Sequence, residues 1–284
     1  MRRLIVNADD FGLTSGVNRA ILRAHNSGIV TSTTLMANGQ GFEQAVELAR
    51  AAPQLGVGCH VVLVDGTPVL QASQVGSLAD ERGRFPAPIS EFAWRCLRGR
   101  IAEDEVEAEV TAQIRKLKTA GIKVTHVDAH KHTHMFPPVL RPMLRAAKAC
   151  GVQAVRNPVE SIRLGHVLRS GLWRRWGQLQ VLRRIAGNFR KTVAEAGMTT
   201  TDGTLGIVAT GSLRAAIFNM ILEHIPEGTW EMVCHPGYND AELDRIDTRL
   251  RESREQELEL LTGPGLRQKL GERGIALISY GDLN

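Results

Sequence analysis

The chain has few cysteines and none of the segments that direct a protein into or across a membrane. Its 284 residues include four cysteines, and their spacing is not that of a metal site. No apolar run reaches the length of about 18 residues that a transmembrane helix needs. The first ten residues become acidic too early for a secretory signal. These absences predict a cytoplasmic protein with buried, reduced thiols.

The composition is typical of a globular protein with a large core. Hydrophobic residues make up 43% of the chain and charged residues 23%. The length suits one barrel-sized domain or two small domains. The sequence contains no internal repeat and no low-complexity tract. We therefore expect a soluble, compact fold.

Positive charge is concentrated in one segment. The net charge is +5, yet residues 163–191 contain eight arginines and lysines and no acidic residue. The rest of the chain is therefore net acidic, which argues against a general nucleic-acid-binding surface. Apolar residues recur at helical spacing within the segment, at Leu172, Trp176, Leu179, Leu182, Ala186 and Phe189. Such a helix suits contact with a membrane, with the barrel or with a second subunit, and the sequence leaves these open.

Short apolar runs alternate with helical patterns along the chain. We predict strands at residues 4–6, 30–36, 57–64, 124–128, 154–156, 205–208, 231–234 and 275–279. Helices are predicted at residues 15–26, 42–52, 102–120 and 137–150, and a long loop at residues 65–90.

This alternation predicts an α/β fold with a parallel sheet. The length and the eight predicted strands favour a single closed or nearly closed β/α barrel that spans residues 1–284. An open, doubly wound sheet is the alternative. A dinucleotide-binding fold would carry Gly-x-Gly-x-x-Gly after the first strand, whereas this chain has Asp-Asp-Phe-Gly there.

Ionisable residues stand at the carboxyl ends of five predicted strands, which meet at one rim of a β/α barrel. These residues are Asp9 and Asp10, His60, Asp128 and His130, Arg156, and His235. Asp9 and Asp10 would point to opposite sides of an extended chain, so one carboxylate could bind a metal ion while the other acts as a base. Arg156 could keep a nearby aspartate ionised, and His235 is a candidate general acid.

The stretch of residues 126–134 has histidine or aspartate at every second position, and an extended chain would place these side chains on one face. Imidazole and carboxylate ligands suit Zn²⁺, Ni²⁺, Co²⁺ or Mn²⁺. A site made of Asp10, His60 and His130 would leave positions open for water and substrate, as catalytic metal sites do.

Three further histidines have open roles. His126 is predicted to support the metal ligands or to pack in the core. His132 and His134 either line a substrate pocket or lie in a surface loop. Cys59 is predicted to pack on the face of its strand opposite to His60.

At these residues the chain resembles the YdjC-like carbohydrate deacetylases. The shared elements follow one another in order along nearly the whole chain, which makes the resemblance specific. They are Asn-Ala-Asp9-Asp10-Phe-Gly-Leu, Val-Thr-Ser-Thr-Thr-Leu-Met, Gly-Cys-His60-Val-Val-Leu, Ser77-Leu with Gly83-Arg-Phe, His126-Val-Asp128-Ala-His130-Lys-His132-Thr-His134, Val155-Arg156-Asn-Pro and His235-Pro-Gly-Tyr.

The resemblance implies an irregular β/α barrel of seven or eight strands, related to the NodB-type polysaccharide deacetylases, with a helical insertion at about residues 160–200. It implies hydrolysis of the N-acetyl group of an amino sugar by water that a single divalent metal ion activates. Zn²⁺ is the expected ion, with Mg²⁺, Mn²⁺, Co²⁺ and Ni²⁺ as alternatives.

The resemblance also assigns roles to residues. Asp10, His60 and His130 would hold the metal. Asp9 would be the base and His235 the acid, and Arg156 would belong to the same catalytic group. The implied substrate-binding residues are Asp128, His132, His134, Phe11 and Tyr238.

Within this family the chain is most similar to the hopanoid-biosynthesis-associated (HpnK-type) branch, which would act on an N-acetylglucosaminyl hopanoid. Such a lipid would explain a membrane contact through residues 163–191, so we expect a cytoplasmic enzyme at the periphery of the inner membrane. Soluble chito-oligosaccharide is the alternative substrate. A homo-oligomer is left open, and no nucleic-acid partner is expected.

Three other classes of protein fit the sequence less well. A metal-dependent phosphoesterase would gather more carboxylates around a second metal ion, about 3.5–4 Å from the first. A glycosidase would need two carboxyl groups that flank the glycosidic bond. A non-enzymatic membrane-binding module would have no use for the histidine-rich rim.

Overall fold

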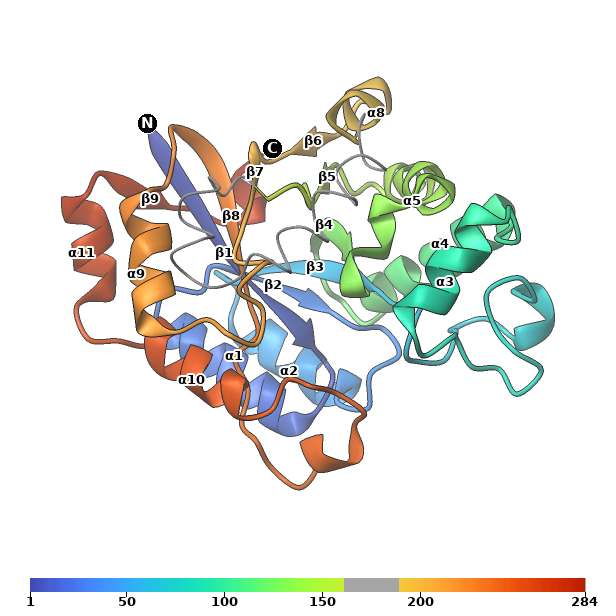
Figure 1. The fold of residues 1–284 in the computed structure, drawn as a ribbon, viewed down its shortest axis with the longest axis horizontal. Coiled ribbons are helices and arrows are strands. Elements are labelled where there is room, and N and C mark those ends of the chain that lie inside the picture. Colours follow the sequence, from blue (N-terminus) through green and yellow to red (C-terminus); the bar gives the residue numbers. More distant parts are fainter. Residues whose placement is uncertain (161–188, 284) are drawn as a thin grey trace.

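A curled sheet of parallel strands forms the centre of the molecule (Figure 1). The computed structural model describes residues 1–160 and 189–283. The strands are β1 (Arg2–Phe11), β2 (Ser32–Leu35), β3 (Gly56–Val61), β4 (Val124–Ala129), β5 (Ala154–Val155), β6 (Thr199–Thr200), β7 (Gly203–Leu205), β8 (Gly228–Cys234) and β9 (Ile275–Leu277). Their order is β6-β5-β4-β3-β2-β1-β8-β7, and β9 pairs with β1 outside this path.

The sheet closes irregularly. The first residues of β1 pair with β9, while Asn7 to Phe11 pair with β2. An isolated parallel bridge between Glu160 and Thr204 joins the chain that follows β5 to β7. The predicted irregular β/α barrel is therefore confirmed, and the open, doubly wound alternative is not.

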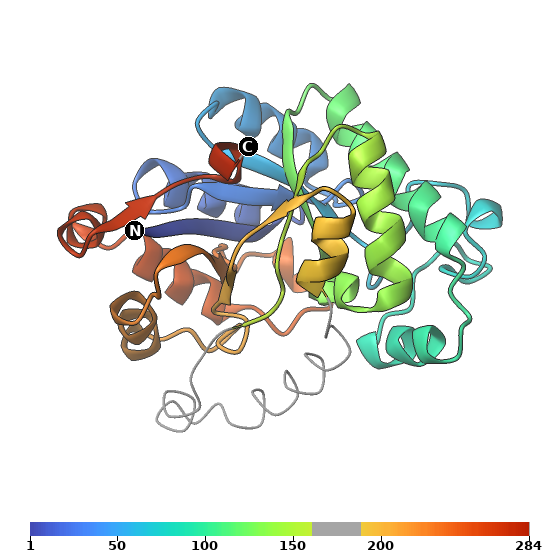
Figure 2. The same cartoon turned by 90° about the horizontal axis from the view of Figure 1, so that it is seen from above.

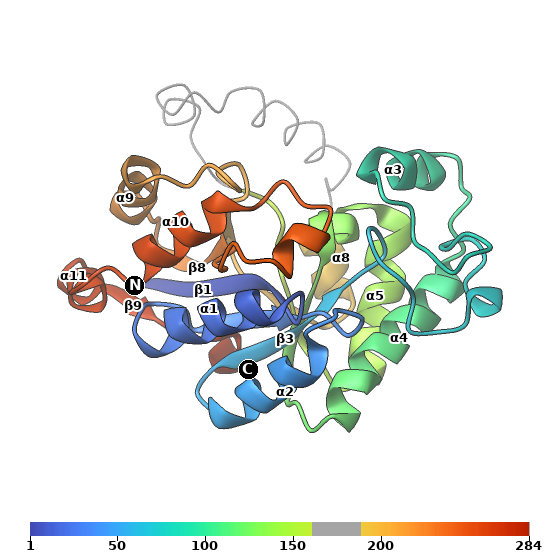
Figure 3. The ribbon, with the colours of Figure 1, turned by 90° about the horizontal axis from the view of Figure 1, so that it is seen from below.

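Helices cover the outside of the sheet. The α-helices are α1 (Ser15–Asn26), α2 (Phe42–Ala51), α3 (Ile89–Leu97), α4 (Glu103–Thr119), α5 (Pro137–Ala149), α8 (Phe189–Glu195), α9 (Ala215–Glu223), α10 (Glu252–Leu261) and α11 (Leu266–Glu272). Short 3₁₀ helices are η1 (Ala72–Gln74), η2 (His130–Met135), η3 (Leu243–Arg245) and η4 (Tyr280–Leu283). Helices α1, α2 and α10 lie together beside β1, whereas α4 and α5 pack on each other near β3 and β4 (Figure 3).

Local sequence explains several helix boundaries. The hydroxyl of Thr14 accepts the Val17 N–H at 3.2 Å and so caps the start of α1. Helix α4 has three acidic residues in its first turn and lysines in its last, which suits the helix dipole. Helix α5 begins at Pro137, where proline is tolerated because that N–H has no partner within the helix.

Side chains of β1 alternate between the helix layer and the barrel interior. Leu4, Val6 and Ala8 join the main hydrophobic core under the helices. Ile5, on the other face, belongs to a small separate cluster with Ala154 and Tyr280. Ile5 lies in the first half of β1, and Figure 2 shows both chain termini toward the end of the sheet where β1 begins.

The strand predictions failed in three places. Strand β1 continues to Phe11, so Asp9 and Asp10 lie within it. The strand predicted at residues 205–208 is instead β7 (Gly203–Leu205), because Gly206 adopts a φ of 95° that ends the extended chain. The two-residue strand β6 was missed, since a pair of threonines gives no periodic signal.

The structure describes only part of the predicted insertion and of the basic segment. Residues 161–188 lie outside the described residues, so the helical stripe and most of the basic segment are not described. Helix α8 begins at Phe189. Among residues 1–160 and 189–283, no helix is both long and apolar enough to span a bilayer.

Candidate metal and catalytic site

The ionisable residues predicted at the strand ends meet at one rim of the barrel. Asp9 and Asp10 come from the end of β1, His60 from β3 and Asp128 from β4, while His130, Arg156 and His235 each follow the end of a strand. Parallel strands deliver their carboxyl ends to the same edge, which is why residues far apart in sequence become neighbours. Asp9, Asp10, His60, Asp128 and Arg156 are all at most 2% exposed.

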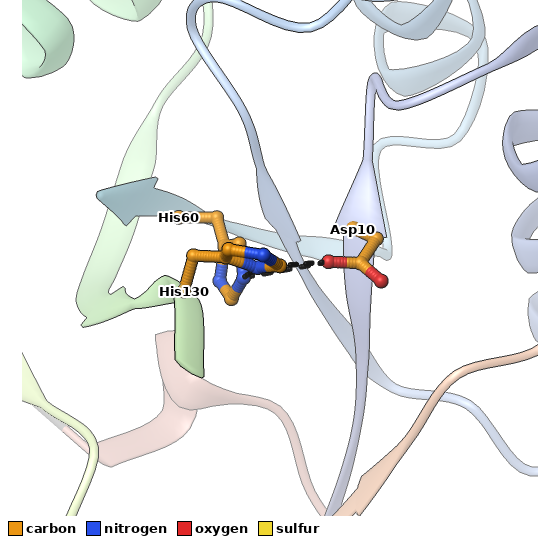
Figure 4. Close-up of side chains that lie close together, drawn as sticks. All are labelled: Asp10, His60 and His130. Atoms are coloured by element: carbon orange, nitrogen blue, oxygen red, sulfur yellow. Dashed lines mark hydrogen bonds and ion pairs between the residues drawn. The ribbon is translucent and has the colours of Figure 1, made fainter. Parts of the chain in front are cut away.

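Asp10, His60 and His130 form a triangle of potential ligand atoms (Figure 4). Asp10 Oδ1 lies 3.6 Å from His60 Nε2 and 3.4 Å from His130 Nδ1, and the two nitrogens are 3.3 Å apart. Atoms bound at about 2.1 Å to a tetrahedral ion are separated by about 3.4 Å. The three side chains therefore fit one divalent ion, and one carboxylate with two imidazoles is a donor set that suits Zn²⁺ and related metals.

His60 is oriented by groups behind it. Its Nδ1 lies 2.7 Å from Asp128 Oδ1 and 3.1 Å from the hydroxyl of Thr34, which leaves Nε2 directed at the triangle. Burial disfavours the charged imidazole, but the nearby carboxylates outweigh it and raise the pKa of His60 to about 9. A cation that binds here therefore has to displace a proton from His60.

Asp9 is held by Arg156. The guanidinium donates to both oxygens of Asp9, at 2.6 and 2.8 Å, and the amide of Asn7 donates to Oδ1 at 2.9 Å. Burial alone would raise the pKa of Asp9, but Arg156 overcomes that effect and holds the pKa well below its usual range. Asp9, His60 and Asp128 also lie close enough to share a metal, but the guanidinium already supplies the cation there.

Arg156 forms ion pairs with three buried carboxylates. Besides Asp9, it contacts Asp128 Oδ2 at 2.5 Å and Glu231 Oε1 at 2.7 Å. Tyr280 donates its hydroxyl to the other oxygen of Glu231 at 2.5 Å. The sequence-based idea that Arg156 keeps an aspartate ionised and oriented thus agrees with these contacts.

His235 lies beside Asp9, with Nε2 at 3.8 Å from Asp9 Oδ2. Its backbone N–H donates to Glu257 Oε2 at 2.6 Å. Burial lowers the pKa of His235 to about 4, despite the opposing influence of Asp9 and Asp10. The imidazole is therefore neutral at pH 7, and its Nδ1 has no partner among the described residues.

Backbone strain is concentrated around this cluster. In the described part of the chain, the residues other than glycine with a positive φ are Asp10, Asp65, Lys131 and His132, at 68°, 55°, 51° and 54°. Asp65 pairs with Lys131 and lies 3.9 Å from His130 Nε2. Left-handed backbone at such residues costs energy and is typical of functional sites.

The strain at Asp10 corrects one prediction. Asp9 and Asp10 do not point to opposite sides, because each lies within metal-sharing distance of His60. The left-handed φ of Asp10 and a register shift between Ala8 and Phe11 turn the chain at this point. Both carboxylates consequently face the same site.

The histidine-rich stretch is not extended throughout, as the alternation predicted. Strand β4 ends at Ala129, and residues 130–135 form η2 with left-handed residues at its start. His126 stacks on Tyr280 with ring centroids 3.7 Å apart, so it packs inside the barrel. His134 is fully buried, which excludes a surface loop, and the His132 and His134 rings lie 6.2 Å apart.

Two predicted substrate-binding residues make other contacts in this structure. Phe11 is fully buried in the main hydrophobic core. The hydroxyl of Tyr238 accepts from Arg23 on α1 at 3.4 Å. The structure therefore gives Phe11 and Tyr238 packing and surface contacts, whereas Asp128 supports His60.

Sequence reasoning missed several residues that support the site. Glu231 could have been noticed, because a charged residue within the apolar strand Trp-Glu-Met-Val-Cys is unusual. Thr34 carried no signal among its neighbouring threonines. Arg254 and Glu257 were not predicted because helix α10 contains many charged residues, and charged residues on a helix are ordinarily solvated.

The fold and the cluster define a class: a β/α barrel whose rim brings together a carboxylate and two histidines that could hold a divalent ion, next to a second aspartate and a further histidine. The chain belongs to the YdjC-like protein family, whose profile matches residues 3–272.

Relatives with assigned names are similar over their whole length. A protein from Brevibacillus brevis named carbohydrate deacetylase is 35% identical over 282 residues, with 99% of each chain covered. A protein from Escherichia fergusonii named chitooligosaccharide deacetylase is 30% identical over 292 residues, again with 99% of each covered.

A solved structure shares the fold closely. A protein from Enterococcus faecalis, described as a candidate cellobiose-phosphate cleavage protein, superposes with a TM-score of 0.79 at 28% identity. The match covers 99% of this chain and 98% of that one.

Proposed function

We propose that this protein is a metal-dependent hydrolase that removes the N-acetyl group from an acetylated amino sugar. The triangle formed by Asp10, His60 and His130 carries the proposal, because it matches the ligand separation of a single ion. The names of the family's carbohydrate deacetylases support the reaction type.

The metal would polarise the acetyl carbonyl and acidify a water molecule. Asp9 takes the proton of the attacking water. Because Arg156 makes Asp9 a weak base, the proton passes on to His235, whose Nε2 is 3.8 Å away and whose pKa is higher. His235 then donates a proton to the departing amine nitrogen, without which an amide C–N bond breaks poorly. Proton uptake and release therefore balance within these two residues.

The polar atoms beside the cluster support a sugar substrate. The ring Nδ1 of His132 is buried and has no hydrogen-bond partner among the described residues, while the residue as a whole is partly exposed. A neutral imidazole can donate to and accept from hydroxyl groups, so we assign His132 to the substrate pocket. His134 is fully buried and its ring lies 6.2 Å from that of His132, so we assign it to the support of His132 and not to contact with the sugar.

Two substrates fit the proposal. The name of the E. fergusonii relative supports soluble chito-oligosaccharide. The amphipathic, basic segment of residues 163–191 supports an N-acetylglucosaminyl hopanoid lipid at the inner membrane. A phosphoesterase is disfavoured, because Asp9 and Asp128, the two carboxylates of the second group of potential ligands among the described residues, are already paired with Arg156.

Acetate release tests the function. Purified protein is incubated with N-acetylglucosaminyl lipid, with chito-oligosaccharide and with a phosphate ester, before and after treatment with dipicolinate. We expect acetate from one of the acetylated substrates, loss of activity on chelation and recovery with added Zn²⁺. Hydrolysis of the phosphate ester alone, or acetate release that survives complete removal of metal, would contradict the proposal.

A further inference from the structure

We propose that Arg254 on helix α10 is a positioning residue for the metal site. It holds one oxygen of Asp10 and thereby directs the other oxygen at His60 and His130. The inference rests on the proposed function only in treating Asp10 as a metal ligand.

The two oxygens of Asp10 have separate partners. Oδ2 accepts from Arg254 Nη2 at 2.6 Å, while Oδ1 lies 3.4 and 3.6 Å from the ligand nitrogens of His130 and His60. Arg254 is itself anchored, because its Nε donates to the carbonyl of Leu250 at 3.2 Å. The carboxylate is thus fixed to present a single oxygen to an ion.

Helix α10 holds both sides of the rim. Arg254 and Glu257 are three residues apart, so they share one face of the helix. Arg254 reaches Asp10 at the end of β1, and Glu257 accepts the backbone N–H of His235 after β8 at 2.6 Å. One rigid element therefore sets the separation of the metal ligand and the proton-transfer histidine.

The loop after His235 makes room for this arginine. A Cβ at Gly237 would lie 2.8 Å from Cδ of Arg254, closer than packed atoms approach. The N–H of Gly237 also donates to the carbonyl of Arg254 at 3.3 Å. A side chain at Gly237 would push Arg254 out of its path toward Asp10.

A contribution to the stability of the fold does not by itself explain why an arginine is buried at position 254. The residue is 1% exposed, its one carboxylate partner among the described residues is Asp10, and its Nη1 has no partner there. Arg156, by contrast, forms ion pairs with three carboxylates. A positive charge next to a cation site is also electrostatically unfavourable. Control of the Asp10 orientation offsets these costs.

Equilibrium Zn²⁺ affinity tests the proposal without substrate. Metal-free full-length protein competes with a chromophoric chelator for Zn²⁺. We expect Arg254→Met to weaken binding on the order of 10- to 100-fold, as loss of a group that orients a ligand does elsewhere. Arg254→Lys should retain more affinity than Arg254→Met, and Gly237→Ala should lose affinity because it displaces the arginine.

Two variants on the same helix serve as controls. Arg251→Met removes a more exposed arginine, which pairs with Asp244 away from the site, and should leave Zn²⁺ affinity unchanged. Glu257→Gln should lower the rate of acetate release but not Zn²⁺ affinity. Folding of each variant is checked by circular dichroism, and Gly237→Ala and Arg254→Lys decide the question if Arg254→Met does not fold.

Unchanged Zn²⁺ affinity in folded Arg254→Met would overturn the proposal, as would an equal loss in Arg251→Met. The affinity measurement is independent of the reaction. A wild-type protein that binds Zn²⁺ through these residues but releases no acetate would refute the proposed function and leave the role of Arg254 to be decided by affinity.

Discussion

Replacement of Arg156 by methionine should destabilise the protein strongly at neutral and alkaline pH. The guanidinium is fully buried and contacts the carboxylates of Asp9, Asp128 and Glu231 at 2.5–2.8 Å. Removal of one partner from a buried ion pair costs about 3–5 kcal/mol, because the remaining charge loses its compensation. With three carboxylates affected, we expect a loss of at least about 4 kcal/mol in the free energy of unfolding.

The loss in the free energy of unfolding caused by Arg156→Met should become smaller as the pH falls. Beside Arg156, the pKa of Asp9 lies below its unfolded value of 3.8, so Asp9 stabilises the fold above that pH and loses this effect only in strong acid. Without Arg156, burial raises the pKa of Asp9, and the cost of the buried charge is greatest at high pH. The difference between wild type and variant should therefore shrink from about pH 8 to about pH 5, by up to about 1.4 kcal/mol per pH unit for each proton bound.

Urea unfolding of the metal-free proteins, followed by tryptophan fluorescence, measures this difference. Arg145→Met is the matched control, because Arg145 also contacts two carboxylates, Glu103 and Glu107, but is 49% exposed. Its loss should be at most about 1 kcal/mol and independent of pH. A loss in Arg156→Met no larger than that of this control, or a loss that did not vary with pH, would show that Arg156 does not compensate the buried carboxylates.

Three further changes have expected outcomes. Asp9→Asn should lower kcat by roughly 10²- to 10⁴-fold while Zn²⁺ affinity is retained, and a near-normal rate would rule out Asp9 as the base. Burial raises the pKa of Glu160 to about 7, so its neutral form stabilises the fold below pH 4.5 and this effect is lost as pH rises through 7. Glu160→Gln should therefore flatten the decline of wild-type stability between about pH 5 and 8, which urea unfolding at several pH values would show. Gly58→Ala would place a Cβ 2.5 Å from the ring of His126, so a loss of about 1–3 kcal/mol is expected in the same assay, and an unchanged stability would contradict the close packing seen there.

Much of the fold could be predicted because its signals are local. The predicted boundaries of α1 and α4 lie within one residue of those in the structure. A capping threonine precedes α1, and the charges at the two ends of α4 follow the helix dipole. Strand β6, with two residues, is set by its neighbour in the sheet and leaves no clear pattern in the sequence.

The part of the candidate site that lies at the ends of predicted strands could be predicted from the sequence. Asp10, His60 and His130 could be grouped because parallel strands bring their carboxyl ends together. The left-handed turn at Asp10 and the 3₁₀ helix after Ala129 depend on tertiary contacts, so an extended chain was assumed in both places and was wrong. Arg254 reaches Asp10 from 244 residues away, a contact that no local pattern encodes.

Anomalous diffraction from crystals of the wild-type protein loaded with Zn²⁺ would locate the ion among these side chains. We expect one strong peak at about 2.0–2.2 Å from Asp10 Oδ1, His60 Nε2 and His130 Nδ1, with Asp9 still bound to Arg156. A protein that shows no peak at these three atoms, or that holds its ion between Asp9 and Asp128 instead, would contradict the proposed metal site.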